Sequence, residues 1–454
     1  MSVNLTYLVI ISLLVMVFIA TRRIKSDGNE YFVLNKTEKT FGLTMSFYAS
    51  GMGLWILTSP AEVAWYGLGY DIYGYALSAA TPFILIYIFG PRISRLLPDG
   101  ITLAQFVEKK YGTVAQKIVS VVAVIYMGAF LIAEFASISF LFESVSGVSG
   151  IVVSALVAAT TFLYLNKTGF KASYITDKIQ GIGIVLLLTL LFGLWFNQNS
   201  LNEISNFANL GGLNTFETYS LKSALAVVIA VTAAEIFSTG YWQRTFSAIN
   251  EATIKKASIY SGLGVFVTIL LLGIAGAVGA GKGLETPTLS FIDQLNLNSV
   301  TVMVLISLAT LLVTSSVDTL ENAISSTISI DIIKKGSKEA NAITLVVIIL
   351  ALFASTTVTN IFTVFLVADL FATSLVFPAF YRIKKASKNM VLVVPFVGSL
   401  ISVFIYRYLF IDLQENPGGV FVPTDLYGLA DLNTFAIALF SSVLITLVMD
   451  RFNK

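Results

Sequence analysis

The sequence of 454 residues contains no cysteine and no histidine. These absences exclude disulfides, thiolate metal sites, the usual zinc ligand and the usual proton carrier near neutral pH. Charged residues make up only 12%, about half of what a soluble domain carries. The net charge of +2 gives no reason to expect a nucleic-acid partner. No constellation for hydrolytic or redox chemistry is recognisable, so the sequence does not indicate an enzyme.

Hydrophobic residues make up 56% of the chain, and apolar runs of about twenty residues recur along its whole length. Such runs predict membrane-spanning helices, so we expect an all-α polytopic protein embedded in a lipid bilayer. We expect about thirteen spans. Their predicted ranges are 4–20, 41–68, 72–96, 114–145, 148–166, 172–196, 221–247, 256–281, 299–331, 339–355, 358–382, 389–408 and 433–450.

Lys and Arg test the orientation of these spans. The basic residues at 22–25 follow the first apolar run, which is typical of an uncleaved span and not of a signal peptide. With the N-terminus outside and the C-terminus inside, Lys222, Lys282 and Arg407 are the only outer ones among the 28 Lys and Arg. This asymmetry follows the positive-inside rule and predicts that orientation, which we expect in a prokaryotic cytoplasmic membrane.

The predicted span at 41–68 reads FGLTMSFYASGMGLWILTSPAEVAWYGL and is interrupted. Gly51, Gly53 and Pro60 weaken a helix and leave backbone carbonyls without intrahelical partners. Broken helices of this kind line the midplane binding sites of transporters, where free carbonyls coordinate a cation. A glycine-mediated crossing of two helices is the alternative interpretation of this segment.

A polar stripe runs along the predicted span at 299–331, which contains VTSSVDTLENAISS at 313–326. At 100° per residue, several polar side chains fall within one arc of about 100°. They are Ser315, Asp318, Thr319, Asn322, Ser326 and Ser329. A carboxylate at the centre of a membrane costs about 2.5 kcal/mol or more, so the stripe indicates an aqueous or ion-lined path. Each serine taken alone is more often bonded to its own backbone.

Further acids lie within predicted spans, with Arg244 at an inner edge as the nearest basic residue. These acids are Glu62, Glu134, Glu235, Asp369 and, near an inner end, Asp177. Buried carboxylates without buried bases must be protonated, hydrated or paired with a mobile cation. Hydroxyls, carboxylates and free carbonyls are the ligands that a hard cation prefers. The residues alone therefore predict a helical transporter that handles a cation.

Several segments together resemble the solute:sodium symporter family. They are ASGMGLW at 49–55, PDGITLAQFVEKKYG at 98–112, TGFKASYITDKIQ at 168–180, YWQRTFSA at 241–248 and TSSVDTLENAISSTISIDI at 314–332. The resemblance implies a LeuT-type fold with two inverted repeats of five helices. The repeats would lie at 41–196 and 221–382 around an outer loop at 197–220, and 1–40 and 383–454 would hold peripheral spans.

The resemblance also implies a sodium site between the first and eighth helices of this core. By position, its ligands would be the carbonyls of Ala49, Met52 and Leu312 and the hydroxyls of Ser315 and Ser316.

Some branches of the family hold a second sodium closer to the cytoplasm. Its ligands here would be Asp177, Ser315, Asp318 and Thr319. The alternative for Asp177 is an ion pair at the inner surface with a neighbouring lysine.

The function that the resemblance implies is sodium-coupled import of a small polar solute by alternating access, carried out by a monomer. YWQR at 241–244 is similar to the urea and polyamine branch, and Gly51 stands where the proline branch has an acid. The alternatives are a proline-like amino-acid symporter, a solute sensor of the same fold that does not transport, and a passive channel.

Candidate substrate residues are acids and aromatics near the expected cavity. They are Trp55, Glu62, Glu134, Glu235, Tyr241 and Trp242. Carboxylates pair with ammonium or amide donors and aromatic faces attract cations, so we expect urea, a polyamine or a quaternary amine. The acids could instead be protonated structural groups, and Tyr241 and Trp242 could be interfacial aromatics.

Overall fold

The computed structural model describes residues 2–24, 26, 28–34, 36–382, 385, 387–411, 419–425 and 428–452. Lys25, which belongs to the predicted inner basic cluster, lies outside the described residues.

The described part of the chain is all-helical. The α-helices are α1 (Val3–Thr21), α2 (Thr40–Gly51), α3 (Ser59–Tyr66), α4 (Gly69–Leu96), α5 (Leu103–Tyr111), α6 (Thr113–Ser146), α7 (Gly150–Thr168), α8 (Phe170–Gln198), α9 (Leu201–Leu210), α10 (Thr218–Glu235), α11 (Thr239–Ser247), α12 (Glu251–Gly281), α13 (Ser299–Thr327), α14 (Ser337–Ser355), α15 (Ile361–Phe380), α16 (Met390–Phe410) and α17 (Leu432–Phe452). Shorter turns are η1 (Gly28–Tyr31), η2 (Leu54–Leu57), η3 (Pro287–Leu289), η4 (Ile292–Gln294) and η5 (Ile328–Ile333).

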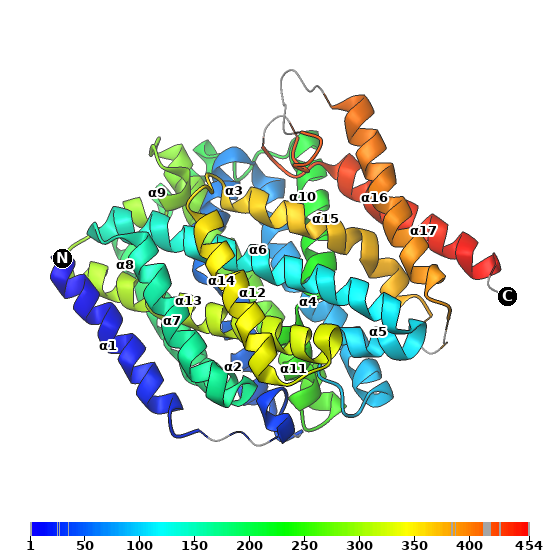
Figure 1. Cartoon of the computed structure of the whole chain (residues 1–454). Helices are drawn as coiled ribbons and strands as arrows, with labels where there is room; N and C mark the ends of the chain where they lie inside the picture. Colours follow the sequence, from blue (N-terminus) through cyan, green and yellow to red (C-terminus); the bar gives the residue numbers. More distant parts are fainter. Residues whose placement is uncertain are drawn as a thin grey trace.

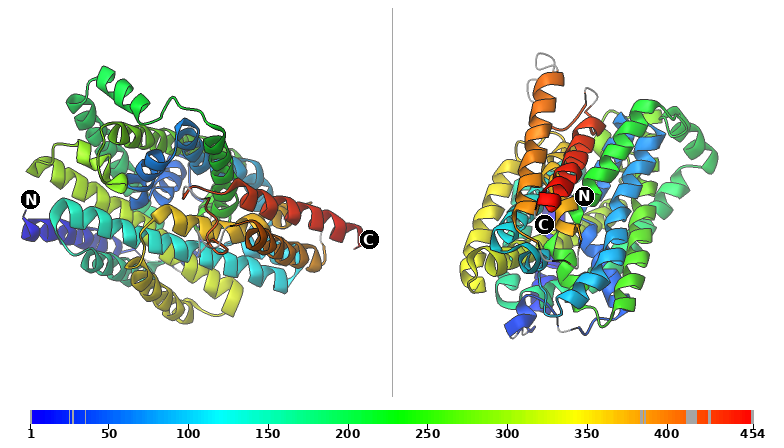
Figure 2. Two further views of the ribbon diagram at one scale, coloured as in Figure 1. Left: turned by 90° about the horizontal axis from the view of Figure 1, so that it is seen from above. Right: turned by 90° about the vertical axis from the view of Figure 1, so that its right-hand side faces the viewer.

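Among the described residues, 11 segments are long and apolar enough to cross a membrane. One of them, Gly150–Gln198, contains both α7 and α8, which meet at Gly169 with its φ of 54°. The predicted span at 41–68 is not among them because its break divides it into helices of 12 and 8 residues. These two features account for the difference from the predicted spans. The termini lie at opposite ends of the molecule (Figures 1 and 2).

The central helices pack in matched pairs. α4 packs on α10 as α12 packs on α2, and α6 packs on α15 as α13 packs on α8. Two repeats related by a twofold axis would give such pairs, so the packing agrees with the predicted repeats, whose boundaries stay predictions. Figure 1 shows α1 at one side of the bundle and the pair α16 and α17 at the other.

α13 lies at the centre of the bundle. In its apolar stretch 78% of the residues are buried, the highest share among the candidate spans, against 17% for α1. The hydroxyls and carboxylates of α13 therefore face protein and not lipid. This burial is what the polar stripe requires, because an unpaired polar group facing hydrocarbon would cost several kcal/mol.

Two central helices are broken. α2 ends at Gly51, because Met52 leaves the helical conformation with φ −110° and ψ 85°. The chain then continues through η2 into α3. α10 ends at Glu235, and α11 begins at Thr239. Breaks of this kind leave backbone N–H and C=O groups without intrahelical partners.

Candidate functional site

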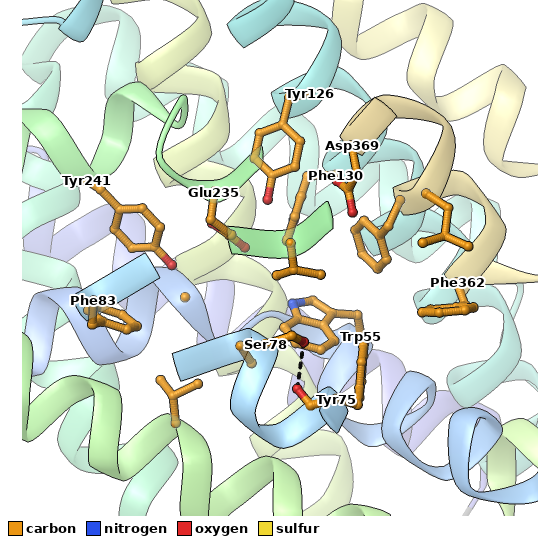
Figure 3. A pocket seen from close by; sticks show the side chains of 16 residues that line it. Trp55, Tyr75, Ser78, Phe83, Tyr126, Phe130, Glu235, Tyr241, Phe362 and Asp369 are labelled. Carbon is orange, nitrogen blue, oxygen red and sulfur yellow. Dashed lines mark hydrogen bonds between the residues drawn. The ribbon is translucent and has the colours of Figure 1, made fainter. Parts of the chain in front are cut away.

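A cavity of about 30 Å³ lies between the two broken helices. This is room for the centres of roughly two water molecules. Its walls come from α2, η2, α4, α6, α10, α11, α12 and α15, and the close-up in Figure 3 shows the side chains that line it. The polar and aromatic lining residues are Trp55, Tyr75, Ser78, Phe83, Tyr126, Phe130, Glu235, Tyr241, Phe362, Phe365 and Asp369. All lining residues belong to the described chain, and none of them is Lys or Arg.

Half of the lining residues are aromatic, and several of their rings pack on one another. The Trp55 ring lies edge-on to Tyr75, Phe130 and Phe365, with centroid distances of 6.2, 6.3 and 5.9 Å. Edge-to-face contacts of this kind stabilise a fixed ring arrangement. Ring faces carry a negative quadrupole, so a cavity built of them favours a cation over an anion.

Two carboxylates reach the cavity from different helices. Glu235 is the last residue of α10, and the hydroxyls of Tyr126 and Tyr241 lie beside it in the cavity. Asp369 comes from α15, and in the described structure its buried Oδ2 has no hydrogen-bond partner. Figure 3 shows both carboxyl groups directed into the cavity. The C-terminal end of a helix carries partial negative charge, which adds to that of Glu235 and makes the site attractive to a cation.

Three of the predicted substrate residues, Trp55, Glu235 and Tyr241, line this cavity. Glu62 of α3 is buried, and its Oε2 has no hydrogen-bond partner among the described residues. Trp242 is fully buried and donates from Nε1 to the carbonyl of Ile236 at 2.7 Å, so it satisfies a carbonyl freed by the break in α10. These two side chains support the walls and do not line the cavity.

Sequence reasoning missed several lining residues. Tyr75, Tyr126 and Phe130 carried no distinguishing signal, because aromatic residues make up 13% of the chain. Asp369 was detectable, since it follows Phe362 and Phe365 at a spacing that places all three on one face of a helix.

The predicted sodium ligands come from two segments that pack directly on each other, the end of α2 and the middle of α13. Ser315 Oγ donates to Asp177 Oδ1 at 2.9 Å, and Ser316 Oγ donates to Glu134 Oε1 at 3.1 Å. A hydroxyl that gives its hydrogen to a carboxylate keeps its lone pairs for another partner. Both serines can therefore serve as oxygen ligands for a cation while their hydrogens stay bonded.

Glu134, a predicted substrate residue, lies beside the predicted sodium ligands and does not line the cavity. Its Oε2 accepts from the backbone N–H of Leu54 at 2.8 Å, directly after the break in α2. A Cβ atom on Gly53 would lie 1.6 Å from Glu134 Oε1, so only glycine leaves room for this carboxylate. Glu134 thus joins the break in α2 to Ser316 of α13.

A narrow space of about 10 Å³ links the two sites. It shares Gly51, Glu235 and Tyr241 with the substrate cavity and reaches Ser316 and Thr319 on α13. A substrate and a cation bound at these places would therefore be separated by a few side chains only.

The burial of Arg244 differs from the sequence expectation. The sequence placed Arg244 at an inner edge with no base among the buried acids, but its side chain is fully buried and forms an ion pair with Asp177. The guanidinium also donates to Thr319 Oγ1 at 2.8 Å and to Ser46 Oγ at 2.8 Å. Two of the predicted second-sodium ligands, Asp177 and Thr319, therefore already share a protein cation. Every residue of α11 is buried, which explains why a residue near the sequence edge of a span lies inside the bundle.

Asp318 is held by hydroxyls of α7 and α8 and not by Arg244. It accepts from Tyr164 at 2.5 Å, Ser173 at 2.8 Å and Thr176 at 3.0 Å. Several donors converging on one buried carboxylate compensate much of its lost hydration. The ion pair between Asp177 and a lysine at the inner surface is not formed, because Asp177 pairs with Arg244 and is fully buried.

The lower part of the polar stripe is covered by α11. Asn322 Nδ2 donates to Gln243 Oε1 at 3.2 Å, and Gln243 Nε2 donates to Ser326 Oγ at 3.0 Å. Thr239 and Thr327 share a hydrogen bond at 2.7 Å. The predicted aqueous path is therefore filled by side chains in this state, and α11 would have to move to open it.

No family model matches the chain. Over 442 residues the chain is 24% identical to the spermidine transporter DUR31 of Candida albicans, covering 93% of this chain and 84% of the relative. Over 233 residues it is 24% identical to "Probable urea active transporter 1" of Schizosaccharomyces pombe, covering 46% of this chain and 34% of the relative. Both relatives are transporters from fungi and not enzymes, in agreement with the expectation for this chain.

Solved structures resemble this fold over nearly its whole length. A Na⁺-coupled sialic acid symporter in a substrate-bound outward-open state has a TM-score of 0.77 at 15% identity, covering 98% of this chain and 97% of the symporter. The nucleobase-cation-symport-1 family transporter Mhp1, in a closed conformation, has a TM-score of 0.59 at 12% identity, covering 94% of this chain and 95% of Mhp1. The predicted all-α, multi-pass LeuT-type fold is confirmed. Membership of the solute:sodium symporter family, the orientation and the kind of membrane stay predictions.

The contact between Gly53 and Glu134 generates a first prediction. Gly53→Ala should displace Glu134 from Leu54 and Ser316, lowering the free energy of unfolding by about 1–3 kcal/mol because buried hydrogen bonds are lost. It should also reduce the rise in thermal unfolding midpoint that sodium produces in the purified protein. In the control Gly128→Ala, the new Cβ would meet no described atom closer than Val347 Cγ1 at 3.9 Å. Identical behaviour of the two variants would contradict this account of Glu134.

The buried pair of Arg244 and Asp177 generates a second prediction. Arg244→Gln and Asp177→Asn each leave one buried charge without its partner, so each should lower the free energy of unfolding by about 3–5 kcal/mol. The double variant should lose much less free energy of unfolding than the two single variants lose together, because it leaves no unpaired buried charge. Unfolding of the four proteins in detergent measures this cycle, and strictly additive losses would mean that the two side chains are not coupled.

Proposed function

We propose that this chain is a sodium-coupled secondary active transporter that imports a small cationic amine by alternating access and works as a monomer. The observation that carries the proposal is the cavity between the two broken helices, which combines aromatic faces with the carboxylates of Glu235 and Asp369. A cation is the ligand that this chemistry favours. A polyamine fits this description, and the name of the Candida albicans relative points to the same class of substrate.

Urea is the second candidate substrate, and the Schizosaccharomyces pombe relative favours it. Urea is small and can donate hydrogen bonds to Glu235, but it is neutral. Two carboxylates in one aromatic cavity repel each other, and urea would not relieve that repulsion. We therefore rank a cationic amine before urea.

Sodium coupling rests on the arrangement at the end of α2. The expected ligands are the carbonyls of Ala49, Met52 and Leu312 and the hydroxyls of Ser315 and Ser316. Oxygen ligands of this kind suit a hard monovalent cation, and the carboxylates of Asp177 and Glu134 bonded to the two serines add negative charge around it. The Na⁺-coupled symporter with the same fold supports the choice of ion.

A second sodium ion would need a rearrangement first. Its expected ligands are Asp177, Ser315, Asp318 and Thr319, but Arg244 bonds both Asp177 and Thr319 in the described state. A like charge beside a guanidinium is unfavourable, so the second ion could enter only after Arg244 moves away. We therefore propose one coupled sodium ion for this state.

The other candidate functions fit the site less well. An amino-acid symporter needs a positive group for the substrate carboxylate, yet no lining residue of the cavity is basic and Arg244 is held by Asp177. A sensor of the same fold would bind the amine without moving it, and a passive channel would move it without accumulation.

Uptake into proteoliposomes separates these functions. With sodium outside and potassium inside, the purified protein should accumulate radiolabelled spermidine above its equilibrium level. With potassium on both sides, accumulation should be absent. Equilibration without accumulation under both conditions would indicate a channel, and binding without uptake would indicate a sensor. Either result would contradict the proposed function.

Ser316 provides a test of the ion site. Ser316→Ala removes one oxygen ligand, so the sodium concentration for half-maximal uptake should rise by about tenfold, the equivalent of one lost polar contact. The control Ser307→Ala removes a hydroxyl from α13 away from the ion site and should leave the sodium dependence unchanged. Unaltered sodium dependence in folded Ser316→Ala would show that this serine is not a ligand.

Glu235 provides a test of the substrate site. Glu235→Gln keeps the shape of the side chain but removes the negative charge. Uptake of spermidine should fall by about tenfold or more, whereas uptake of any neutral substrate such as urea should change by less than about twofold. Equal losses for charged and neutral substrates would assign Glu235 a structural role.

A further inference from the structure

The two carboxylates of the cavity differ in how their oxygens are satisfied. Glu235 is half-buried, and the hydroxyls of Tyr126 and Tyr241 point toward it (Figure 3). Asp369 is only 2% exposed, and its Oδ2 has no partner among the described residues. A buried carboxylate oxygen without a partner costs several kcal/mol unless something else neutralises it. Asp369 therefore has an oxygen open to a second ligand group, in addition to the group that binds at Glu235.

α15 holds Asp369 in the wall of the cavity. Phe362 and Phe365 precede it on the same face of the helix and line the cavity as well. The backbone carbonyl of Asp369 accepts from Thr373 Oγ1 at 2.8 Å, as is common within a membrane helix. The carboxylate oxygen Oδ2 has no partner among the described residues, and Figure 3 shows the carboxyl group entering the cavity from a different helix than Glu235.

Glu235 and Asp369 line the same small cavity, together with Tyr75 and Tyr126 (Figure 3). Two carboxylates in one low-dielectric site repel each other, and one monovalent cation neutralises only half of this charge. A second positive charge on the same ligand would neutralise the rest. Aromatic side chains, Trp55 and Phe130 among them, form the wall of the same cavity and suit an apolar linker between the two charges.

We propose that the substrate is a dication, an alkane chain with an ammonium group at each end, and that Asp369 is the residue that selects it. One ammonium group binds at Glu235 and its tyrosines, and the other binds at Asp369. The alkyl chain between them lies against the aromatic wall. This inference rests on the proposed function and deepens it, because it names the class of amine and the residue that distinguishes diamines from monoamines.

The bound state needs more room than the described cavity offers. About 30 Å³ accommodates roughly two water molecules, so the aromatic side chains or α15 must shift when a diamine enters. A shift of this kind is ordinary for a transporter that alternates between conformations.

The test compares two amines of equal length on the purified protein. Putrescine has an ammonium group at both ends of a four-carbon chain, and n-butylamine has one. Binding is measured in sodium by competition with radiolabelled spermidine. The native protein should bind putrescine at least about tenfold more tightly than n-butylamine, because one charge-assisted contact is lost in the latter. Asp369→Asn should weaken the binding of putrescine by about tenfold and the binding of n-butylamine by less than about twofold.

Asp293→Asn is the matched control, because Asp293 is an exposed carboxylate of η4 away from the cavity. It should leave the affinities for both amines unchanged. Equal affinity of the native protein for the two amines would overturn the inference while leaving an amine transporter intact. Equal weakening of the binding of both amines in folded Asp369→Asn would also overturn the inference and leave an amine transporter intact.

The experiment also separates this inference from the proposed function. If the native protein binds neither amine nor spermidine, the proposed function itself fails.

If Asp369→Asn does not fold, the comparison of putrescine with n-butylamine on the native protein still decides the inference. The same comparison on Asp369→Glu, which keeps the charge on a longer side chain, supplements it. A preserved preference for putrescine in Asp369→Glu, with altered optimal chain length among diamines, is the expected result. Loss of any preference there would contradict the role of Asp369.

Discussion

Buried carboxylates beside broken helices are the constraint on which this structure depends. Asp177, Glu134, Glu235 and Asp369 all lie within the bundle, where an isolated charge is expensive because neither water nor lipid can solvate it well. Asp177 pairs with Arg244, and Glu134 accepts from a backbone N–H at the break in α2. Glu235 lines the cavity beside the hydroxyls of Tyr126 and Tyr241, whereas Asp369 Oδ2 has no partner among the described residues. A ligand group in the cavity can supply that partner.

The arrangement links ion and substrate through shared backbone. Glu134 bonds Leu54 directly after the break in α2 and also holds Ser316, a proposed sodium ligand. Trp55, the next residue along the chain, lines the substrate cavity. A sodium ion that orders this break would therefore also fix one wall of the cavity, which is a direct physical route from ion binding to substrate affinity. Gln243 and Arg244 of α11 close one end of the polar stripe. If this end faces the cytoplasm, as the proposed orientation has it, release there would require α11 to leave α13.

Much of the fold could be predicted from the sequence, because apolar runs, basic loops and paired glycines each have one dominant physical consequence. Gly51 and Gly53 predicted the break in α2. The polar stripe predicted an aqueous or ion-lined path along α13, which side chains of α11 fill in the described structure. The burial of Arg244 could not be predicted in this way, since a span read as continuous places that residue at an edge. The break at 236–238 and the full burial of α11 change its position. The roles of Glu134 and Trp242 were also hidden, because both depend on which backbone groups a break leaves free.

The central claim is that sodium at the break in α2 and an amine in the aromatic cavity bind cooperatively. The most direct test is the dissociation constant of radiolabelled spermidine for the purified protein, measured in sodium and again in potassium at equal ionic strength. The account predicts at least about tenfold tighter binding in sodium and, by reciprocity, an equal tightening of sodium binding by spermidine. Equal spermidine affinity in the two salts would contradict it.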